Sequence, residues 1–256
     1  MLTLYFSGTG NTKYIAELFA AKMNTACHSI EEKVNFTPLI AEHETVAFCY
    51  PIYGSRVPRI MRDFVESIRH ALNGKKIIIF CTQFLFSGDG ARAFTDLCNA
   101  NVIYAEHFLM PNNIGNFPFL PISDVKSQAK YLRRAERKMD IVCGNIRSGI
   151  VKKRGFNMIS RGFGLMQGIH FPRMEAKAAN DVRIDADCIV CGVCVSVCPT
   201  DNLSVADGKI SQHGRCTLCY RCVNKCPKMA ITAFTHRKGK RQYKFKEANH
   251  AKESKK

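Results

Sequence analysis

Two closely spaced runs of cysteine near the C-terminus are the residues best suited to chemistry in this chain. Each run reads C-x2-C-x2-C-x3-C-P, and together they hold eight of the thirteen cysteines. Thiolates at this spacing bind iron–sulfur cubanes: three close cysteines hold three corners of one cluster, and the fourth, beyond a helical turn, reaches the other cluster. The pattern predicts two [4Fe–4S] clusters, one on Cys188, Cys191, Cys194 and Cys226 and one on Cys216, Cys219, Cys222 and Cys198.

Zinc and disulfide bonds are the alternatives for these cysteines. Structural zinc sites usually show two separated C-x2-4-C pairs, whereas these runs of four are each closed by a proline, Pro199 or Pro227. Disulfides need an oxidising compartment, and the residues after Met1 do not read as a secretory leader. A reducing, cytoplasmic location is therefore expected, with the other cysteines as small buried hydrophobes: Cys27, Cys49, Cys81, Cys98 and Cys143.

The second cysteine run repeats the first together with its flanks. Val182–Ile184 precedes the first run as Ile210–Gln212 precedes the second, and Leu203–Val205 follows the first as Ile231–Ala233 follows the second. Each half therefore predicts a strand, a cysteine loop, a helical turn and a strand, within a small α+β domain over residues 181–236. A domain this small is poorly stabilised by an apolar core alone, so cluster binding is expected to be part of its folding.

A glycine- and hydroxyl-rich loop follows the first apolar segment of the chain. Leu2–Phe6 predicts a strand and Lys13–Met23 a helix, and the loop between them consists of Ser7, Gly8, Thr9, Gly10, Asn11 and Thr12. A loop that opens a helix offers backbone N–H groups to a phosphate, and the hydroxyls and the amide add neutral donors. The third glycine of a dinucleotide site and the Gly-Lys-Ser/Thr of a P-loop are both missing. The alternative is an ordinary turn with a capping threonine.

Strands and helices alternate through the rest of the N-terminal half. Buried strands are predicted at 46–50, 75–81 and 102–109, with helices at about 58–72, 90–98 and 122–147. This alternation predicts a doubly wound, parallel α/β sheet. Ligands of such sheets bind outside the carboxyl ends of the strands. The loops that follow these strands are therefore expected to meet at one edge of the sheet.

The loop from Ser7 to Thr12 resembles the FMN-phosphate loop of flavodoxins, and the loops at Pro51–Ser55 and Thr82–Gly90 resemble the two that flank the isoalloxazine ring in that family. The resemblance covers about residues 1–147 and implies a five-stranded, flavodoxin-like domain that binds FMN. Joined to the cysteine repeat, the whole chain resembles the flavodoxin–ferredoxin fusion proteins of anaerobic bacteria, in which a bacterial-type ferredoxin unit carries the two clusters.

The same resemblance implies which residues contact the flavin ring. Tyr53 and one of Phe84 or Phe86 would stack on it, and Gly54 would offer the peptide that meets flavin N5; core packing is the alternative for the two phenylalanines. The chain departs from typical flavodoxins in having no tryptophan and in being basic. The implied ring-side residues are Pro51, Ile52, Tyr53, Gly54, Thr82, Gln83, Phe84, Phe86, Ser87 and Gly88.

Two further segments complete the expected organisation. Residues 148–180 hold glycines and cations but also apolar side chains that a free tether would not need, so they are expected to form a linker that packs. Residues 237–256 form a basic tail, expected to be disordered at its end. The cations of the helix before residue 147 are expected on a solvated face, with a docking surface as the alternative: Lys126, Lys130, Arg133, Arg134 and Arg137.

A formal net charge of +17 makes the chain strongly basic. A basic surface implies acidic partners, nucleic acid or an anionic membrane surface. Nucleic acid is disfavoured because no base-stacking platform or reading motif accompanies the charge. No uninterrupted apolar run of about 18 residues predicts a membrane span. Acidic redox proteins are therefore the expected partners.

Three functions fit these features. The favoured one is an electron carrier, in which FMN and two clusters couple two-electron to one-electron chemistry between protein partners. The second is a flavin-dependent reductase of a small molecule with the clusters as internal electron supply, for which Gln83 and Arg56 are the nearest polar anchors. The third is a redox sensor that reports to a partner. No nicotinamide fingerprint is visible, which disfavours direct use of NAD(P)H.

Overall fold

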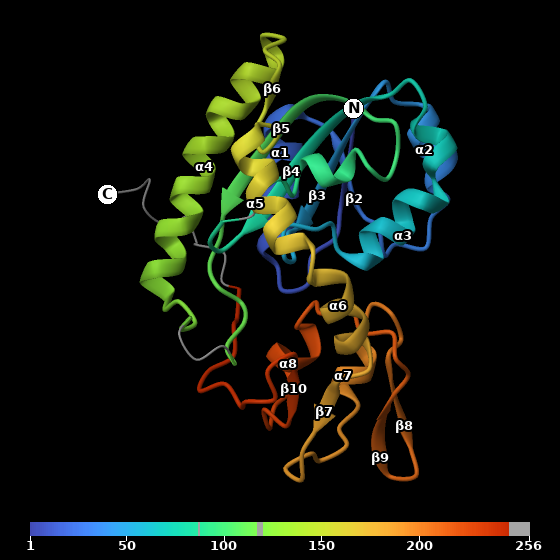
Figure 1. Ribbon diagram of the computed structural model, residues 1–256, viewed down its shortest axis with the longest axis vertical. Helices are drawn as coiled ribbons and strands as arrows, with labels where there is room; N and C mark the ends of the chain where they lie inside the picture. The colour runs from blue at the N-terminus through green and yellow to red at the C-terminus, as the bar shows by residue number, and fades with distance from the viewer. Residues whose placement is uncertain (87, 117–119, 246–256) are drawn as a thin grey trace.

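The computed structural model describes residues 1–86, 88–116 and 120–245 (Figure 1). Its centre is a parallel sheet in the order β2-β1-β3-β4-β5-β6. The predicted doubly wound sheet is thereby confirmed; the strand beyond the five expected is the two-residue β6, which pairs with β5 at the edge. The strands are β1 Leu2–Tyr5, β2 Ala26–Ser29, β3 Thr45–Pro51, β4 Lys76–Gln83, β5 Asn101–Leu109 and β6 Lys152–Lys153.

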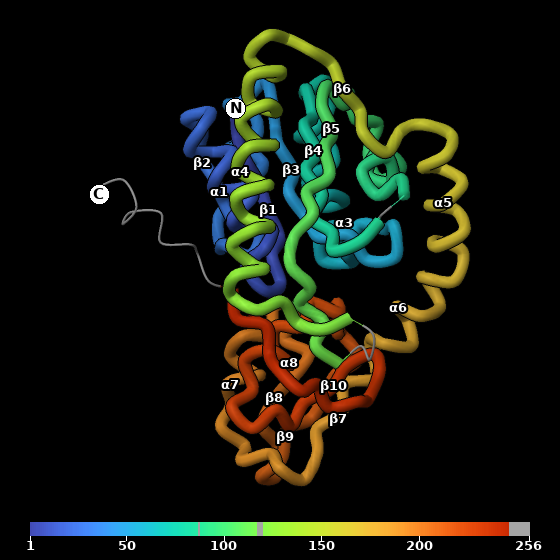
Figure 2. Tube along the Cα trace, turned by 90° about the vertical axis from the view of Figure 1, so that its left-hand side faces the viewer, coloured from blue at the N-terminus to red at the C-terminus, as the bar shows by residue number. Residues whose placement is uncertain are grey.

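Helices cover both faces of the sheet. On one face α1 and α4 pack side by side, and Phe19 and Leu132 meet Phe80 there in one apolar cluster (Figure 2). On the other face the short helices join a second cluster around Phe48 and Ile79. The helices of this unit are α1 Asn11–Met23, α2 Phe36–Ala41, α3 Arg59–Ser67 and α4 Val125–Arg147, with 3-10 turns η1 Arg69–Leu72 and η2 Arg92–Phe94.

The apolar runs of β3 and β4 explain why these strands lie in the middle of the sheet. Successive side chains of a strand point to opposite faces, so Phe48 and Ile79 enter one cluster while Cys49 and Phe80 enter the other. A strand that is apolar at every position is therefore buried on both sides. Of the five cysteines outside the runs, only Cys27 is half-exposed; the other four are buried as predicted.

Two predicted helices are shorter than the pattern indicated. The helix expected over 58–72 divides into α3 and η1, and the one expected over 90–98 is only the 3-10 turn η2. Around η2, Phe94 is fully buried and packs on Phe48 and Tyr50, with ring centroids 4.8 and 5.9 Å apart. This packing fixes the segment between β4 and β5, so tertiary contacts override its helical tendency.

The cysteine-rich unit lies below the carboxyl edge of the sheet (Figure 1). The predicted repeat is present, and both strand pairs join one half of it to the other. β7 of the first half is antiparallel to β10 of the second, and β8 of the first half forms a hairpin with β9 of the second. Its elements are β7 Val182–Ile184, α7 Val193–Ser196, β8 Leu203–Ala206, β9 Lys209–Gln212, α8 Arg221–Lys225 and β10 Ile231–Ala233.

The linker contains α5 Met158–Gly168 and α6 Phe171–Ala179. α6 buries Phe171, Ala178 and Ala179, as expected of a linker that packs, whereas α5 leaves most of its apolar side chains exposed. The cations predicted on a solvated face of α4 are exposed. Among the described residues, no helix combines the length and apolar character needed to cross a membrane.

Candidate functional site

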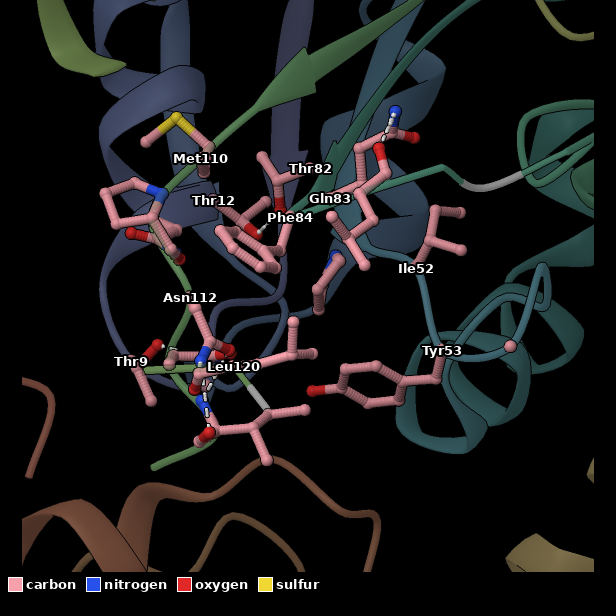
Figure 3. Close-up of a pocket in the computed structure, with 18 of the residues that line it drawn as sticks. Thr9, Thr12, Ile52, Tyr53, Thr82, Gln83, Phe84, Met110, Asn112 and Leu120 are labelled. Carbon is pink, nitrogen blue, oxygen red and sulfur yellow. Dashed lines mark hydrogen bonds between the residues drawn. The ribbon is translucent and has the colours of Figure 1, made fainter. Parts of the chain in front are cut away.

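A cavity of about 460 Å³ opens where β1, β3, β4 and β5 end (Figure 3). In Figure 3, Tyr53 reaches into the cavity from one side, Thr9 and Asn112 face it from the other, and Phe84 lies with Thr12 and Thr82 at the sheet edge. The predicted residues that line it are Ser7, Gly8, Thr9, Asn11, Thr12, Pro51, Ile52, Tyr53, Gly54, Thr82, Gln83, Phe84 and Phe86.

Two of the predicted residues are placed otherwise, and a third lies outside the described part of the chain. Gly10 turns the loop with a φ of 106° and faces Phe245 instead of the cavity. Gly88 also does not line the cavity, and its nearest neighbour is the backbone of Gly164 in α5. Ser87 lies outside the described residues.

The cavity also has walls that the sequence reasoning missed. Most come from the loop after β5, which the rule about carboxyl ends of strands should have included, since a strand was predicted there. Gln167 comes from α5, and nothing in the sequence connected that linker helix with the loops. The additional lining residues are Ser55, Leu85, Met110, Pro111, Asn112, Asn113, Ile114, Leu120 and Gln167.

Hydrogen bonds hold the loop between β1 and α1 in place. The Thr12 hydroxyl pairs with that of Thr82 at 2.7 Å, and the Asn11 amide donates to the carbonyl of Pro111 at 2.9 Å. Asn113 donates to Thr9 Oγ1 at 2.9 Å, which leaves the Thr9 proton to donate. The first backbone N–H groups of α1 have no partner within the helix. The loop therefore presents uncharged hydrogen-bond donors at a helix N-terminus, an arrangement that suits the binding of an anion.

The opposite wall carries the aromatic residues. Burial raises the pKa of Tyr53 well above its usual range, and the electrostatic effect of the nearby Cys219 and Cys216 side chains raises it further. The Phe86 ring is 54% exposed and meets Phe163 of α5 edge-on, with ring centroids 5.2 Å apart. Tyr53 thus lies between the cavity and the second cysteine run.

These residues fit FMN. The helix N-terminus suits the phosphate, and the aromatic wall suits the ring. Gln83 lines the cavity and donates to the carbonyl of Leu85 at 3.0 Å, and its buried Oε1 has no hydrogen-bond partner among the residues that the structure describes. A buried polar atom without a partner is costly, and a ring N–H of a flavin would supply the missing donor.

The eight cysteines of the two runs form two groups. One cavity is lined by Cys188, Cys191, Cys194 and Cys226, and another by Cys198, Cys216, Cys219 and Cys222. The fourth cysteine of each run thus lies with the other run, the exchange on which the predicted ligand sets depend. Within the described residues no group of three or more His, Cys, Asp or Glu is arranged to hold a metal ion, so the cluster assignment depends on spacing and grouping.

Burial sets the protonation of the second group. It raises the pKa of Cys219 to about 12 and that of Cys222 well above its usual range, with the electrostatic effect of the neighbouring cysteines adding to the rise. These thiols are neutral at pH 7 without iron. Because a cluster ligand must be a thiolate, loading of this group releases protons.

The second cysteine group directly contacts the loop between β1 and α1, residues Ser7–Thr12, which we call the flavin loop. The carbonyl oxygen of Cys219 would lie 2.3 Å from a Cβ at Gly8, so only glycine allows this approach. Arg221 donates to the carbonyls of Ser7 and Gly8 at 2.9 and 3.2 Å and pairs with Glu31 at 2.8 Å. Asn224 donates to the carbonyl of Asn113 at 3.0 Å. α8 is thereby tied to two walls of the cavity.

The segment after β10, which is the first part of the basic tail expected over residues 237–256, packs as far as Phe245. Tyr243 is buried and donates from its hydroxyl to Asn11 Oδ1 at 2.5 Å, while its N–H donates to Asn224 Oδ1 at 2.7 Å. The Phe245 ring lies 5.7 Å from that of Tyr14 in α1. Residues 246–256, where disorder was expected, lie outside the described part of the chain.

Two family models match the chain in this order. A flavodoxin domain matches residues 2–117, and a 4Fe-4S binding domain matches residues 182–204, which include the first cysteine run but not the second. No curated protein matches the chain.

Solved structures of flavodoxins align with the N-terminal unit. Megasphaera elsdenii flavodoxin is 21% identical, with 54% of this chain and 99% of that chain covered and a TM-score of 0.38. Flavodoxin 2 from Bacillus cereus is 15% identical, covering 57% and 97% with a TM-score of 0.38. These scores are low, so the assignment depends on the two domain matches and the cysteine runs. The chain is a flavodoxin domain followed by a 4Fe-4S ferredoxin-type domain, a combination that serves electron transport through FMN and iron–sulfur.

Proposed function

We propose that this protein carries one FMN and two [4Fe–4S] clusters and couples two-electron to one-electron steps between protein partners. A flavin exchanges electrons one or two at a time, whereas each cubane passes one. The observation that supports the proposal is the contact of the second cysteine group with the flavin loop, through the Cys219 carbonyl at Gly8 and through the hydrogen bonds of Arg221 to the carbonyls of Ser7 and Gly8. The two sites are neighbours in the fold, so an internal electron path is short.

The residues named above have distinct roles in this proposal. The loop from Ser7 to Thr12 binds the phosphate, Tyr53 and Phe84 enclose the ring, and Gln83 accepts from its edge. The two cysteine groups hold one cluster each. The proposed division of the chain keeps the expected bounds, residues 1–147 for the flavin unit and 181–236 for the cluster unit, and adds 237–245 to the junction between them.

The two cysteine groups differ in solvent exposure, and this difference indicates which of them exchanges electrons with other proteins in the proposed electron path. Cys219 is 7% exposed and lies against the flavin loop, whereas Cys191 of the first group is exposed and its neighbour Ile189 is 57% exposed. The first group is therefore the site that exchanges electrons with other proteins. The second group relays them to the flavin.

Reduction of a small molecule at the flavin is the second candidate. Of its two expected anchors, Gln83 lines the cavity but Arg56 does not; Arg56 packs against Gly168 of α5. α5 borders the cavity through Gln167, and the ferredoxin-type unit packs on the Gly8 and Asn113 loops that form its walls, which restricts access to the ring. Turnover with small acceptors that exceeds turnover with protein acceptors would favour this second candidate over the carrier.

The electron-carrier proposal is tested by measuring the cofactor content of anaerobically purified protein and by rapidly reducing its clusters. Purified protein should contain about eight irons, eight sulfides and one FMN; two zincs without sulfide would disprove the cluster assignment. After rapid one-electron reduction of the clusters, the flavin absorbance should change in a first-order step whose rate is independent of protein concentration. A purely second-order flavin phase would mean that electrons pass between molecules.

A substitution at the junction sharpens this test. Gly8→Ala places a methyl group against the Cys219 carbonyl, and overpacking of this kind costs about 1–3 kcal/mol. The first-order rate should fall, and it is measured on protein reconstituted to full iron and FMN content so that a loss of cofactor is not mistaken for a slower step. Gly144→Ala is the control, because a Cβ at this exposed position in the last turn of α4 meets no atom of the described residues within 4 Å. Equal rates in both variants would remove the Gly8 contact from the path.

A further inference from the structure

The exposed large apolar side chains are concentrated in one segment of the chain. Half of those exposed in the described residues lie between Ile150 and Ile169, although this segment is a small part of the chain. Met158 is 89% exposed and Ile159 74% exposed. We call this set the outer face; it consists of Ile150, Val151, Met158, Ile159, Phe163, Leu165, Met166 and Ile169.

The orientation of α5 is the reverse of that of an ordinary surface helix. Such helices turn an apolar stripe toward the core, but α5 turns glycines inward. A Cβ at Gly164 would lie 1.7 Å from an oxygen of Asp89, and one at Gly168 would lie 2.6 Å from the Arg56 guanidinium. At 3.6 residues per turn, Met158, Ile159 and Met166 then point away from the body. The sequence places small residues against the protein and large apolar ones against the surroundings.

The charged residues of this segment and of its immediate flanks are all basic. From Ser148 to Met174 the sequence holds five Lys and Arg and no Asp or Glu. Lys152 and Arg154 pair with Glu106 in β5. Lys153, Arg161 and Arg173 are exposed and form no ion pair with any residue that the structure describes. Apolar and cationic groups therefore share the exposed side of this segment.

We propose that β6 and α5 dock on an anionic lipid surface. Exposed apolar side chains flanked by unpaired cations on a helix that does not span the bilayer are the pattern of an interfacial helix, in which apolar groups enter the acyl boundary and cations meet the headgroups. Figure 2 shows α5 forming the outer edge of the molecule, where a flat surface can reach it. The outer face follows a protruding helix and so needs no complementary groove.

Charge separates this occupant from the other candidates. A second copy would bring the unpaired cations Lys153, Arg161 and Arg173 of one segment against those of another, and like charges repel at close range. An acidic protein would match the charge, but the cores of protein interfaces favour aromatic side chains, whereas here Phe163 is the only aromatic residue of the outer face. An anionic membrane satisfies both the aliphatic and the cationic groups.

Docking in this way would hold the flavin site near the membrane. Gln167 of α5 lines the flavin cavity, and its side chain accepts from the Ser55 hydroxyl at 2.5 Å. Phe86, which also lines the cavity, meets Phe163 of the outer face. The membrane would therefore lie beside the flavin, leaving the ferredoxin-type unit free to meet protein partners.

Vesicle flotation with the full, cofactor-loaded protein tests the proposal. The protein should float with vesicles of phosphatidylcholine mixed with phosphatidylglycerol and stay unbound with phosphatidylcholine alone. Ile159→Glu combined with Met166→Glu should abolish binding, and Arg161→Glu should lower it about fivefold or more. Ile141→Glu is the matched control, since Ile141 is 64% exposed on α4, and it should bind like the unsubstituted protein.

Three results would overturn the proposal. The first is absence of binding to the anionic vesicles. The second is binding that survives the Ile159 and Met166 substitutions but is lost when residues 246–256 are removed, because the basic tail would then be the binding element. The third is a dimer in sedimentation velocity that these two substitutions convert to a monomer, which would make the outer face an interface between copies. Iron and FMN contents, measured on each variant, show that cofactor loading is unchanged.

Discussion

At the scale of single residues, the fourth cysteine of each run connects the two halves of the ferredoxin-type unit. Cys198 lines the cavity of the second run and Cys226 that of the first. Because each fourth cysteine lies with the other run, its replacement should damage the cluster held by that other run. The crossing also explains how two short repeats become one unit.

Cys198→Ala should therefore remove the cluster held by Cys216, Cys219 and Cys222 while the first cluster remains. Iron content should fall from about eight to about four atoms per chain. Cys226→Ala is the reciprocal control and should spare the buried cluster beside the flavin. Spin resonance of the remaining reduced cluster distinguishes the two variants. Identical residual spectra would contradict the crossed assignment.

Glu106 in β5 is a buried carboxylate surrounded by cations. It is 1% exposed, and Lys138, Lys152 and Arg154 approach it at 2.9, 3.3 and 3.5 Å. Burial opposes its charge, but the hydrogen bond and charge of Lys138 hold the pKa of Glu106 below its usual value. A carboxyl whose folded pKa is lowered stabilises the fold above its unfolded pKa of about 4.3, and this stability is lost as pH falls through the folded pKa.

Glu106→Gln should lower the free energy of unfolding at neutral pH by up to about 3 kcal/mol, the lower end for a broken buried pair, because its partners reach solvent. The loss should shrink as the pH falls from the unfolded pKa of about 4.3 through the lower folded pKa of Glu106, because the carboxyl is then protonated in both states. Urea unfolding followed by circular dichroism at neutral and acidic pH measures both effects. A loss of equal size at both pH values would show that packing, and not charge, is responsible.

At the scale of elements, the segment after β10 fastens the two units together. Gln242 donates to the carbonyls of Val223 and Cys226 at 2.9 and 2.6 Å, and Tyr243 reaches Asn11 in the first turn of α1. One short segment therefore contacts both α8 and the flavin loop. The packing of this segment should therefore affect how firmly the flavin loop is held in the conformation that binds phosphate.

Tyr243→Phe should weaken FMN binding, because it removes the hydroxyl that fixes Asn11. Leaving a buried acceptor without its donor costs about 1–3 kcal/mol. Flavin fluorescence during titration of the FMN-free protein measures the change in Kd. Removal of residues 246–256 is the control and should leave the Kd unaltered. An unchanged Kd in Tyr243→Phe would mean that the segment holds the ferredoxin-type unit without supporting the loop.

At the scale of the whole molecule, the charge of +17 decides how partners approach. Long-range attraction raises association rates with partners of opposite charge, and salt screens it. The exposed cations of α4 are one source of this field. The redox partners of the protein are therefore expected to be acidic.

Electron exchange with an acidic ferredoxin should slow as ionic strength rises. Lys130→Glu combined with Arg134→Glu should lower the rate at low salt and flatten its salt dependence. Stopped-flow absorbance gives the second-order rate constants, and the chain shortened after Phe245 serves as comparison for the part played by residues 246–256. A rate that is the same at low and high salt would exclude electrostatic steering.

The amino-acid sequence by itself determined the two cofactor sites in outline. Cysteine spacing is local, so the crossed groups of Cys198 and Cys226 could be predicted before any fold was known. The alternation of apolar strands with helices likewise predicted the parallel sheet, and the rule about strand ends predicted the cavity walls at Ser7–Thr12, Pro51–Gly54 and Thr82–Phe84. These features depend on neighbours in the chain, which a sequence shows directly.

Only the tertiary structure decided how the two units meet. The approach of Cys219 to Gly8, the hydrogen bond from Tyr243 to Asn11, and the place of Gln167 in the cavity each join residues far apart in sequence. The apolar residues of 148–180 predicted a linker that packs, yet in α5 the glycines pack and the large side chains stay outside. Helical spacing defines two faces, but which of them turns inward depends on the surface that receives it, here Asp89 and Arg56.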